Sequence, residues 1–360
     1  MKRIFVSDCE GPISKNDNAF ELMAHFVPEG DKLFTRISKY DDVLADVVKK
    51  PGYNAGDTLK LILPFLKTYD VTDLQMGEFS AKNILLIANS KGTLEQIRSK
   101  AEAFIISTSY QHYIEALCEA LDFPYENTFC TRLSLDKYEL TQEEKVRLKE
   151  IAREISQTPI VSIPPLAKSL KDFSKQDQKT ICRLDEIFWN EISTMAIGKI
   201  FWEVTPIGGR QKAEAVKDAA ERSRVHLADV MYVGDSITDV EAFRLVRGNG
   251  GLTVSFNGNE YAIRNAEIAV LSENSTVTAI IFDLFFRLGK QETLRVLENW
   301  NRESLQQNMV NKSHLERLQS LYSGALPKVQ IVTTENMEML IKESSEFRKK
   351  VRGEVVGRLG

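Results

Sequence analysis

Side chains that could carry out chemistry stand in four short segments of this 360-residue chain. Two of the segments are acidic: DCEGP holds Asp8 and Glu10, and VMYVGDSITD holds Asp235 and Asp239. Two acidic clusters at strand ends of one sheet indicate a divalent cation, and a ligand set made of oxygens, with no His or Cys ligand, favours Mg²⁺ over zinc. A carboxylate beside such a cation can attack phosphorus and form an aspartyl phosphate, a mixed anhydride that water reopens.

The order of the acidic residues predicts their roles. Asp8 is the expected nucleophile because it comes first after an apolar strand. Glu10 is the expected acid/base, because a residue two positions later lies on the same side of an extended chain. Asp235 is expected to bind the Mg²⁺ directly, and Asp239 to bind it through water or to hold its surroundings in place.

The other two segments supply a fixed cation and a phosphate cradle. An anion that attacks a phosphate dianion meets strong repulsion, and Lys212, at the start of a helical pattern after Gly208-Gly209, would neutralise it. Ser107 and neighbouring backbone N–H groups would hold the phosphate oxygens, since a strand here runs into a helix whose start is rich in hydroxyls. Thr108 is the alternative for that role.

The segments fall on elements that would bring them together. Short apolar runs alternate with helical patterns, which indicates βαβ units and a parallel sheet. In such sheets ligands bind outside the carboxyl ends of the strands. The expected strands are residues 3–7, 101–110, 230–234, 251–256 and 268–272, with one more possible strand at 328–332.

Breaks in the pattern predict the domain organisation. The expected core comprises residues 1–15, 85–135 and 200–285, with a helical cap at 16–84, a second helical insertion at 136–199 and a C-terminal helical extension at 286–360. The cap follows the first strand and would stand over the strand ends. The second insertion would either cap the site from another side or mediate assembly with a protein complex.

The composition limits the classes of molecule that this protein is expected to bind. The formal net charge of −4 argues against an electrostatic nucleic-acid binder and against a polybasic membrane anchor. The sequence contains no run of about 20 apolar residues, so it predicts no membrane span. The four cysteines are widely spaced, which is typical of reduced thiols. We therefore expect a cytoplasmic protein without direct membrane insertion, whose substrate is a small phosphorylated molecule, because two helical insertions would obstruct a polymer.

The four segments resemble the four motifs of the haloacid dehalogenase superfamily of phosphohydrolases, in the same order. The segments DCEGP, SKYDD, NAGDTLKL, ISTSYQHY, GDSITD and FNGNEYA extend the likeness through most of the chain. They resemble an archaeal branch whose members are labelled predicted hydrolases or, in methanogens, the R subunit of energy-converting hydrogenase A. The resemblance implies a Rossmann-like α/β core with a parallel sheet and a cap, and a Mg²⁺-dependent phosphatase.

The resemblance also implies particular roles. Asp8 would be both nucleophile and Mg²⁺ ligand, and the backbone carbonyl of Glu10 would be a further ligand while its side chain serves as the acid/base. By likeness to the motifs, Ser107 would bind the phosphate, Lys212 would position it, and Asp235 and Asp239 would be the acidic pair.

One position departs from the superfamily pattern, which has aspartate where this chain has Glu10. The extra methylene adds roughly 1.5 Å of reach, and a misplacement of that size can cost about 10²-fold in rate. This leaves two alternatives beside an efficient phosphatase. One is a weakly or non-catalytic subunit associated with a hydrogenase complex or its assembly, and the other is a phosphotransferase or mutase.

Overall fold

The computed structural model describes residues 2–308, 312–322 and 324–358. Seven strands form one sheet in the order β3-β2-β1-β4-β5-β6-β7, parallel throughout except that β7 runs antiparallel to β6. This confirms the predicted α/β class. The strands are β1 (Ile4–Ser7), β2 (Ala103–Tyr110), β3 (Thr128–Thr131), β4 (Val230–Gly234), β5 (Leu252–Phe256), β6 (Ile268–Leu271) and β7 (Lys328–Ile331).

The central strands are buried on both faces. Every residue of β1 and β4 is buried, which is why their sequences IFVS and VMYVG are nearly continuous apolar runs rather than alternating ones. Six of the seven strands match the runs seen in the sequence. The sequence did not predict β3, because its four residues, TFCT, contain no continuous apolar run.

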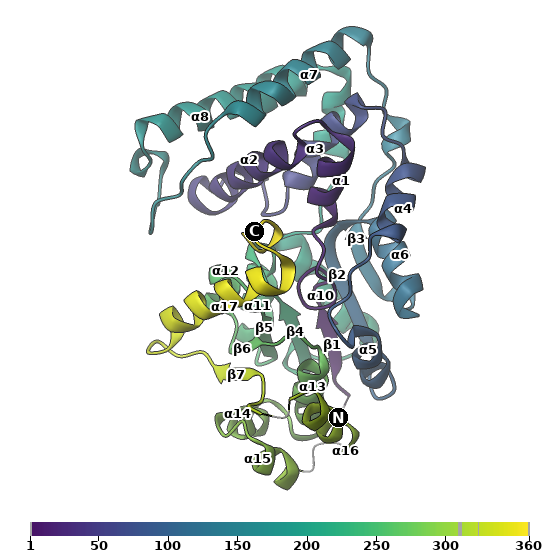
Figure 1. Ribbon diagram of the computed structural model, residues 1–360, viewed down its shortest axis with the longest axis vertical. Helices are drawn as coiled ribbons and strands as arrows, with labels where there is room; N and C mark the ends of the chain where they lie inside the picture. The colour runs from purple at the N-terminus through teal and green to yellow at the C-terminus, as the bar shows by residue number, and fades with distance from the viewer. Residues whose placement is uncertain (1, 309–311, 323, 359–360) are drawn as a thin grey trace.

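Helices cover both faces of the sheet (Figure 1). One face carries α5 (Ser90–Arg98), α6 (Gln111–Leu121), α13 (Thr276–Leu288), α14 (Lys290–Glu298), α15 (Arg302–Gln307) and α16 (Lys312–Leu321). The other face carries α10 (Arg210–Ser223), α11 (Val240–Gly248) and α12 (Glu260–Asn265). The sheet is thus the middle layer of a three-layer core.

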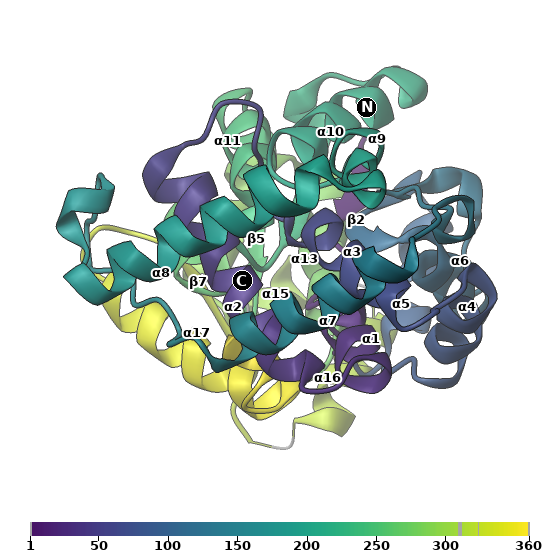
Figure 2. The ribbon, with the colours of Figure 1, turned by 90° about the horizontal axis from the view of Figure 1, so that it is seen from above.

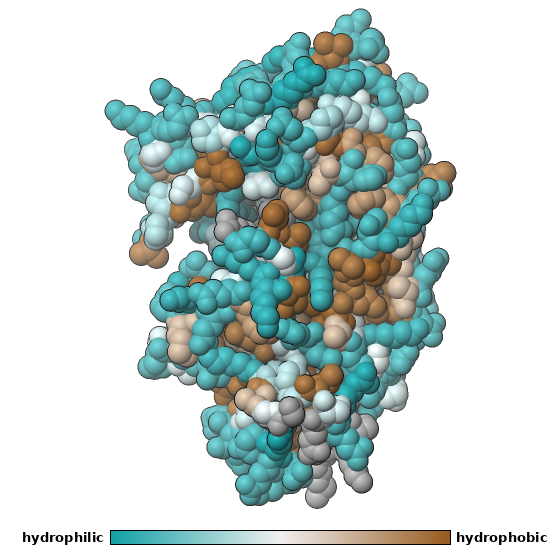
Figure 3. All heavy atoms as spheres, viewed as in Figure 1, coloured by the Kyte–Doolittle hydropathy of each residue, from teal (hydrophilic) through white to brown (hydrophobic). Residues whose placement is uncertain are grey.

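The two helical insertions form a single cap. They share one hydrophobic cluster, in which Tyr40 from the first insertion stacks on Phe188 from the second with ring centroids 5.7 Å apart. The cap helices are α1 (Asn18–Phe26), α2 (Gly30–Asp42), η1 (Val43–Val48), α3 (Thr58–Thr68), α4 (Asp73–Lys82), α7 (Gln142–Gln157), α8 (Lys175–Glu186), η5 (Ile187–Ile192) and α9 (Ile200–Glu203). Figure 2 shows α7 and α8 lying across the top of the molecule. Figure 3 shows mainly hydrophilic residues on their outer surface, as expected for helices with one buried face.

The C-terminal segment returns to the core instead of extending away from it. β7 adds an antiparallel edge strand beside β6, and the last long helix, α17 (Met337–Arg352), then runs back so that its end lies between cap and sheet (Figure 1). One face of α17 is buried along its length through Leu340, Ser344 and Arg348, and the Ser344 hydroxyl donates to the Gly258 carbonyl at 2.6 Å. The terminal helix is therefore anchored over the carboxyl edge of the sheet.

Short 3₁₀ turns connect these elements: η2 (Tyr125–Asn127), η3 (Leu135–Lys137), η4 (Leu170–Asp172), η6 (Ala196–Lys199), η7 (Leu227–Asp229), η8 (Ile237–Asp239) and η9 (Val356–Arg358). Within the described ranges, none of the helices combines the length and the apolar character that a membrane crossing requires.

Candidate active site

The order of the strands places the two acidic segments side by side. From β1 the chain proceeds to β2 and β3 on one side of the sheet, and β4 to β6 lie on the other side, so the topology reverses between β1 and β4. The backbone N–H of Asp8 donates to the Val233 carbonyl at 2.8 Å, so Asp8 and Asp235 leave adjacent strand ends. This reversal is where open α/β sheets form a ligand crevice.

Two glycines make room for the carboxylates. Gly11 has φ of +104°, and a Cβ built there would lie 2.0 Å from Asp235 Oδ2. A Cβ on Gly234 would lie 2.5 Å from Asp239 Cγ. The glycines of DCEGP and VGDSITD are therefore required by the close approach of side chains, and at Gly11 also by the backbone conformation.

Lys212 joins the third segment to the acidic ones. Its Nζ lies 2.6 Å from Asp8 Oδ2 and 2.7 Å from Asp239 Oδ1, and its side chain is 0% exposed. Burial acts to lower the pKa of Lys212, but Asp239 and Asp8 raise it above its usual value, so the amine stays protonated. The first turn of α10 thus places a positive charge beside Asp8, the expected nucleophile.

The charge on Asp239 is fully satisfied by protein groups. Its Oδ1 also accepts from the Tyr232 hydroxyl at 2.7 Å, and its Oδ2 accepts from the backbone N–H groups of Asp235 and Ser236 at 2.9 and 3.0 Å. Burial acts to raise the pKa of Asp239, but Lys212 and these hydrogen bonds lower it. Asp239 is therefore an ionised group that holds the site together.

Of the two carboxylates that contact Lys212, Asp8 is more basic than Asp239. Burial and the neighbouring charge of Asp239 raise its pKa, against the lowering effect of Lys212. Its Oδ1 accepts from the Cys9 N–H at 2.7 Å. A positive charge placed beside Asp8 would therefore favour the ionised form that nucleophilic attack requires.

The donor set fits a hard cation. Carboxylate oxygens of Asp8, Asp235 and Asp239 lie within 4.8 Å of one another, and all three residues are buried. Oxygen donors alone suit Mg²⁺, which binds through one or two carboxylates and keeps several waters. Because Asp239 already accepts four hydrogen bonds and ion pairs, Asp8 and Asp235 are the residues that would hold the ion.

Glu10 faces the cap. Its Oε1 accepts from the backbone N–H of Asn18, the first residue of α1, at 2.7 Å, and its side chain lines the same cavity as Asp8. Burial and the nearby Asp17 raise the pKa of Glu10 well above its usual value. A raised pKa favours the protonated carboxyl group, which is the form that a general acid requires.

The two hydroxyl candidates at the end of β2 lie differently. Thr108 lines the cavity, and its hydroxyl donates to the Ile207 carbonyl at 3.0 Å. Ser107 is buried, accepts from the Ser109 N–H at 3.1 Å, and is not among the described residues that line the cavity. Thr108 is therefore the better placed of the two for contact with a ligand.

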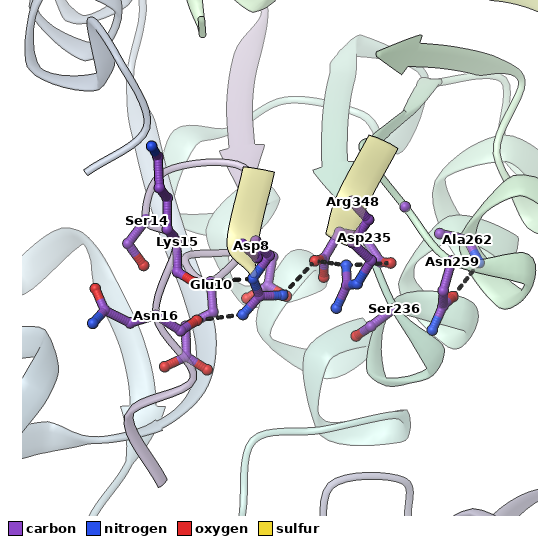
Figure 4. A network of polar contacts seen from close by, with 12 residues as sticks. Asp8, Glu10, Ser14, Lys15, Asn16, Asp235, Ser236, Asn259, Ala262 and Arg348 are labelled. Carbon is purple, nitrogen blue, oxygen red and sulfur yellow. Dashed lines mark hydrogen bonds and ion pairs between the residues drawn. The ribbon is translucent and has the colours of Figure 1, made fainter. Parts of the chain in front are cut away.

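Two arginines that sequence reasoning missed enter the site from α17. Arg348 Nη1 forms a short ion pair with Asp235 Oδ2, and Arg352 Nη1 lies 3.1 Å from the same oxygen. Figure 4 shows Arg348 beside Asp235 and opposite the loop that carries Asp8 and Glu10. In the sequence these arginines belong to a charged helical pattern, EFRKKVR, which is typical of a solvated helix. Their only signal was that Leu340, Ser344 and Arg348 recur every four residues, on one helix face.

The cavity itself is small. Its volume is about 100 Å³, and it lies between the strand ends and cap helices α2 and α3. Its lining consists of Asp8, Glu10, Asp17, Phe34, Ser38, Asp41, Asp42, Gly56, Thr58, Leu59, Thr108, Asp235, Ser236, Ile237, Thr238, Arg348 and Arg352. A larger hollow of about 1000 Å³, bordered by the segments around Trp300 and β7, includes none of the candidate residues.

Comparison with known proteins identifies the family of this chain. Residues 66–280, more than half of the chain, match the model of the haloacid dehalogenase-like hydrolases, which confirms the family resemblance of the motifs. No curated protein matches the chain.

Among solved structures, the gene product AF1437 from Archaeoglobus fulgidus is similar over the whole chain. It is 24% identical, with a TM-score of 0.78, and the match covers 100% of this chain and 99% of that one. This likeness shows that the fold extends through the cap and the C-terminal segment. An apo phosphoserine phosphatase, at 13% identity and a TM-score of 0.46, matches 76% of this chain and 96% of its own.

Proposed function

This chain belongs to the haloacid dehalogenase-like hydrolase family, and we propose that it hydrolyses a small phosphomonoester through an aspartyl phosphate on Asp8. The observation that carries the proposal is the contact of one buried amine, Lys212 Nζ, with both Asp8 and Asp239, next to Asp235. A cation, a nucleophilic carboxylate and a second acidic group in one buried cluster support phosphoryl transfer.

Mg²⁺ is the proposed cofactor, and Asp8 and Asp235 would hold it, together with the Glu10 backbone carbonyl that the superfamily motif implies. When bound, the ion would neutralise charge on the phosphoryl oxygens and on the attacking carboxylate. Lys212 would favour the ionised form of Asp8 against the effect of burial, and Thr108 or Ser107 would hold phosphoryl oxygens at the end of β2.

The chemical steps fall to Asp8 and Glu10. In the first step an Asp8 oxygen attacks phosphorus, the bond from phosphorus to the alcohol oxygen breaks, and the protonated Glu10 gives its proton to that oxygen. In the second step Glu10, now ionised, accepts a proton from a water molecule, the water oxygen attacks phosphorus, and the bond between phosphorus and the Asp8 oxygen breaks. This releases inorganic phosphate and regenerates both carboxyl groups.

The contact between Glu10 and α1 offers a reason for glutamate at this position. Its carboxyl group bonds to the cap at Asn18, so the longer side chain spans the distance from the nucleophile loop to the first cap helix. We propose that the acid is positioned by the cap, and that this offsets the extra methylene.

A small substrate suits the enclosed site. Ligand pockets for drug-sized molecules are typically about 300–1,000 Å³, whereas this cavity is about 100 Å³. The cap helices that close it would also exclude water while Asp8 attacks. A cytoplasmic protein acting on a small phosphorylated molecule remains our prediction.

The test is release of inorganic phosphate from an aryl phosphate and from a panel of small phosphomonoesters, with Mg²⁺ and with EDTA. We expect metal-dependent turnover that Asp8→Asn abolishes. Asp218→Asn is the matched control, because Asp218 lies on the exposed side of α10 and pairs with Arg222. Absence of turnover on every substrate, despite measurable Mg²⁺ binding, would contradict the proposal and favour a binding or assembly role, such as a subunit of a hydrogenase complex.

A further inference from the structure

Helix α17 brings two buried guanidinium groups to the mouth of the site. Arg348 is 2% exposed, and its Nη1 contacts both the side chain and the backbone carbonyl of Asp235. Arg352 has a side chain 5% exposed, and besides Asp235 it donates to the backbone carbonyls of Lys15 and Asn16. The two arginines therefore link the loop after β1 to the loop after β4, and both belong to a segment beyond the family match, which ends at residue 280.

The charges around the cavity make these arginines unusual. Six acidic residues line the cavity: Asp8, Glu10, Asp17, Asp41, Asp42 and Asp235. Among the described residues, its lining includes only two cationic side chains, Arg348 and Arg352. Lys212 lies behind the surface, with its amine bonded to Asp8 and Asp239. A phosphoryl dianion entering the cavity would thus meet acidic groups on most sides, and Arg348 and Arg352 are the cationic side chains of the described lining that could receive it.

We propose that Arg348 and Arg352 bind the phosphoryl oxygens of the substrate, so that the C-terminal helix completes the active site. The proposal rests on the proposed phosphohydrolase function. Arginine suits this role because its planar fork presents paired N–H donors to phosphate oxygens and its charge persists on burial. The backbone carbonyls that hold Arg352 fix its guanidinium at the edge of the cavity before a ligand arrives.

The balance of charge gives the arginines a second effect. The three carboxylates of the metal cluster (Asp8, Asp235 and Asp239) are matched in number by three cations, Lys212, Arg348 and Arg352. Within this group of six side chains, Mg²⁺ would add two positive charges, which a phosphoryl dianion would cancel. Metal and phosphate are accordingly expected to bind with positive cooperativity, and the arginines to disfavour Mg²⁺ when phosphate is absent, because they contact its ligand Asp235.

Binding of Mg²⁺ and of inorganic phosphate, measured by titration calorimetry on the full chain, tests the proposal without requiring turnover. Arg348→Gln and Arg352→Gln should each weaken phosphate binding by about 10- to 100-fold, the usual effect of losing a charge-assisted hydrogen bond. Both should bind Mg²⁺ at least as tightly as the wild type when phosphate is absent. Lys350→Gln is the matched control, since this exposed lysine of α17 pairs with Glu273 and should leave both affinities unchanged.

A purely structural role for the arginines predicts a different pattern. Gln variants that remain folded and bind phosphate within about twofold of the wild type would overturn the proposal, whatever their melting temperatures. Should the Gln variants not fold, Arg348→Lys and Arg352→Lys keep the charge and serve to assign the two arginine Nε–H resonances. Titration of the wild type with phosphate must then shift those resonances, and unchanged resonances at saturation would equally overturn it.

The outcomes separate this inference from the proposed function. Arginine-dependent phosphate binding without turnover on any substrate would support the anion site and contradict the phosphohydrolase. Turnover with wild-type KM in the arginine variants would support the phosphohydrolase and contradict the anion site.

Discussion

Replacement of Lys212 by methionine measures how much the buried ion pairs contribute to the core. Lys212 is 0% exposed and contacts Asp8 and Asp239 at 2.6 and 2.7 Å, so Lys212→Met leaves two buried carboxylates without their shared cation. Breaking a buried pair by removing one partner costs about 3–5 kcal/mol. We therefore expect the free energy of unfolding, measured by urea denaturation in EDTA, to fall by about that amount.

Bound Mg²⁺ and low pH should both reduce the loss of stability that Lys212→Met causes. Mg²⁺ at about 100 times its dissociation constant stabilises a folded protein by about 2.7 kcal/mol, and in the variant it would take over the neutralisation of Asp8. Protonated carboxyl groups need no cation. The difference between variant and wild type should therefore be smaller near pH 5 than near pH 8.

Lys217→Met on the same helix is the control for loss of a lysine from α10. Lys217 pairs with Glu214, and both side chains are about half exposed, so this substitution should cost no more than about 1 kcal/mol. If Lys212→Met in EDTA destabilises the protein no more than Lys217→Met does, Lys212 does not hold the two carboxylates together and the reasoning is refuted.

Three further predictions concern the metal site and the acid. Gly11→Ala should weaken Mg²⁺ binding at least about tenfold by calorimetry, because its Cβ would displace Asp235. Gly52→Ala is the control, because Gly52 also has a positive φ (+76°) but open space around it, and equal affinities of the two variants would refute the prediction. Burial raises the pKa of Asp8, so binding of Mg²⁺ must displace a proton, and the affinity for Mg²⁺ should rise with pH up to that pKa. Calorimetry in buffers of different ionisation enthalpy measures the proton release, and a pH-independent affinity without proton release would contradict the prediction. In Glu10→Asp the shorter side chain cannot reach the Asn18 N–H of α1, so kcat should fall about 10²-fold with little change in KM. A wild-type kcat in steady-state assays would show that this contact with the cap is not needed.

The terminal helix also changes how the C-terminal segment is understood. The sequence predicted a helical extension at 286–360 with one possible strand at 328–332, and the structure shows that the strand joins the sheet and that the segment also adds side chains to the candidate site. Removal of the segment would therefore expose the β6 edge and leave Asp235 without its two arginine partners. For this reason the tests above use single substitutions in the full chain.

The sequence by itself determined the acidic end of the site. Asp8 and Asp235 could be placed because each directly follows a buried apolar run, and a buried run that ends in a polar turn is a local pattern. The neighbouring glycines were equally visible, and the structure supplies their reason, which is the close approach of Asp235 to Gly11 and of Asp239 to Gly234. The order of these motifs along the chain was also sufficient to identify the family.

Only the tertiary structure decided what covers the site. The two insertions looked separate because a helical pattern shows which face is apolar but not which helix will cover it, and the contact of Tyr40 with Phe188 joins them into one cap. Arg348 lies 113 residues from Asp235 in the sequence, and Arg352 lies 117 residues away. A charged residue in an amphipathic helix looks the same whether it faces water or a buried carboxylate, so the arginine side of the site became visible only when the chain had folded back on itself.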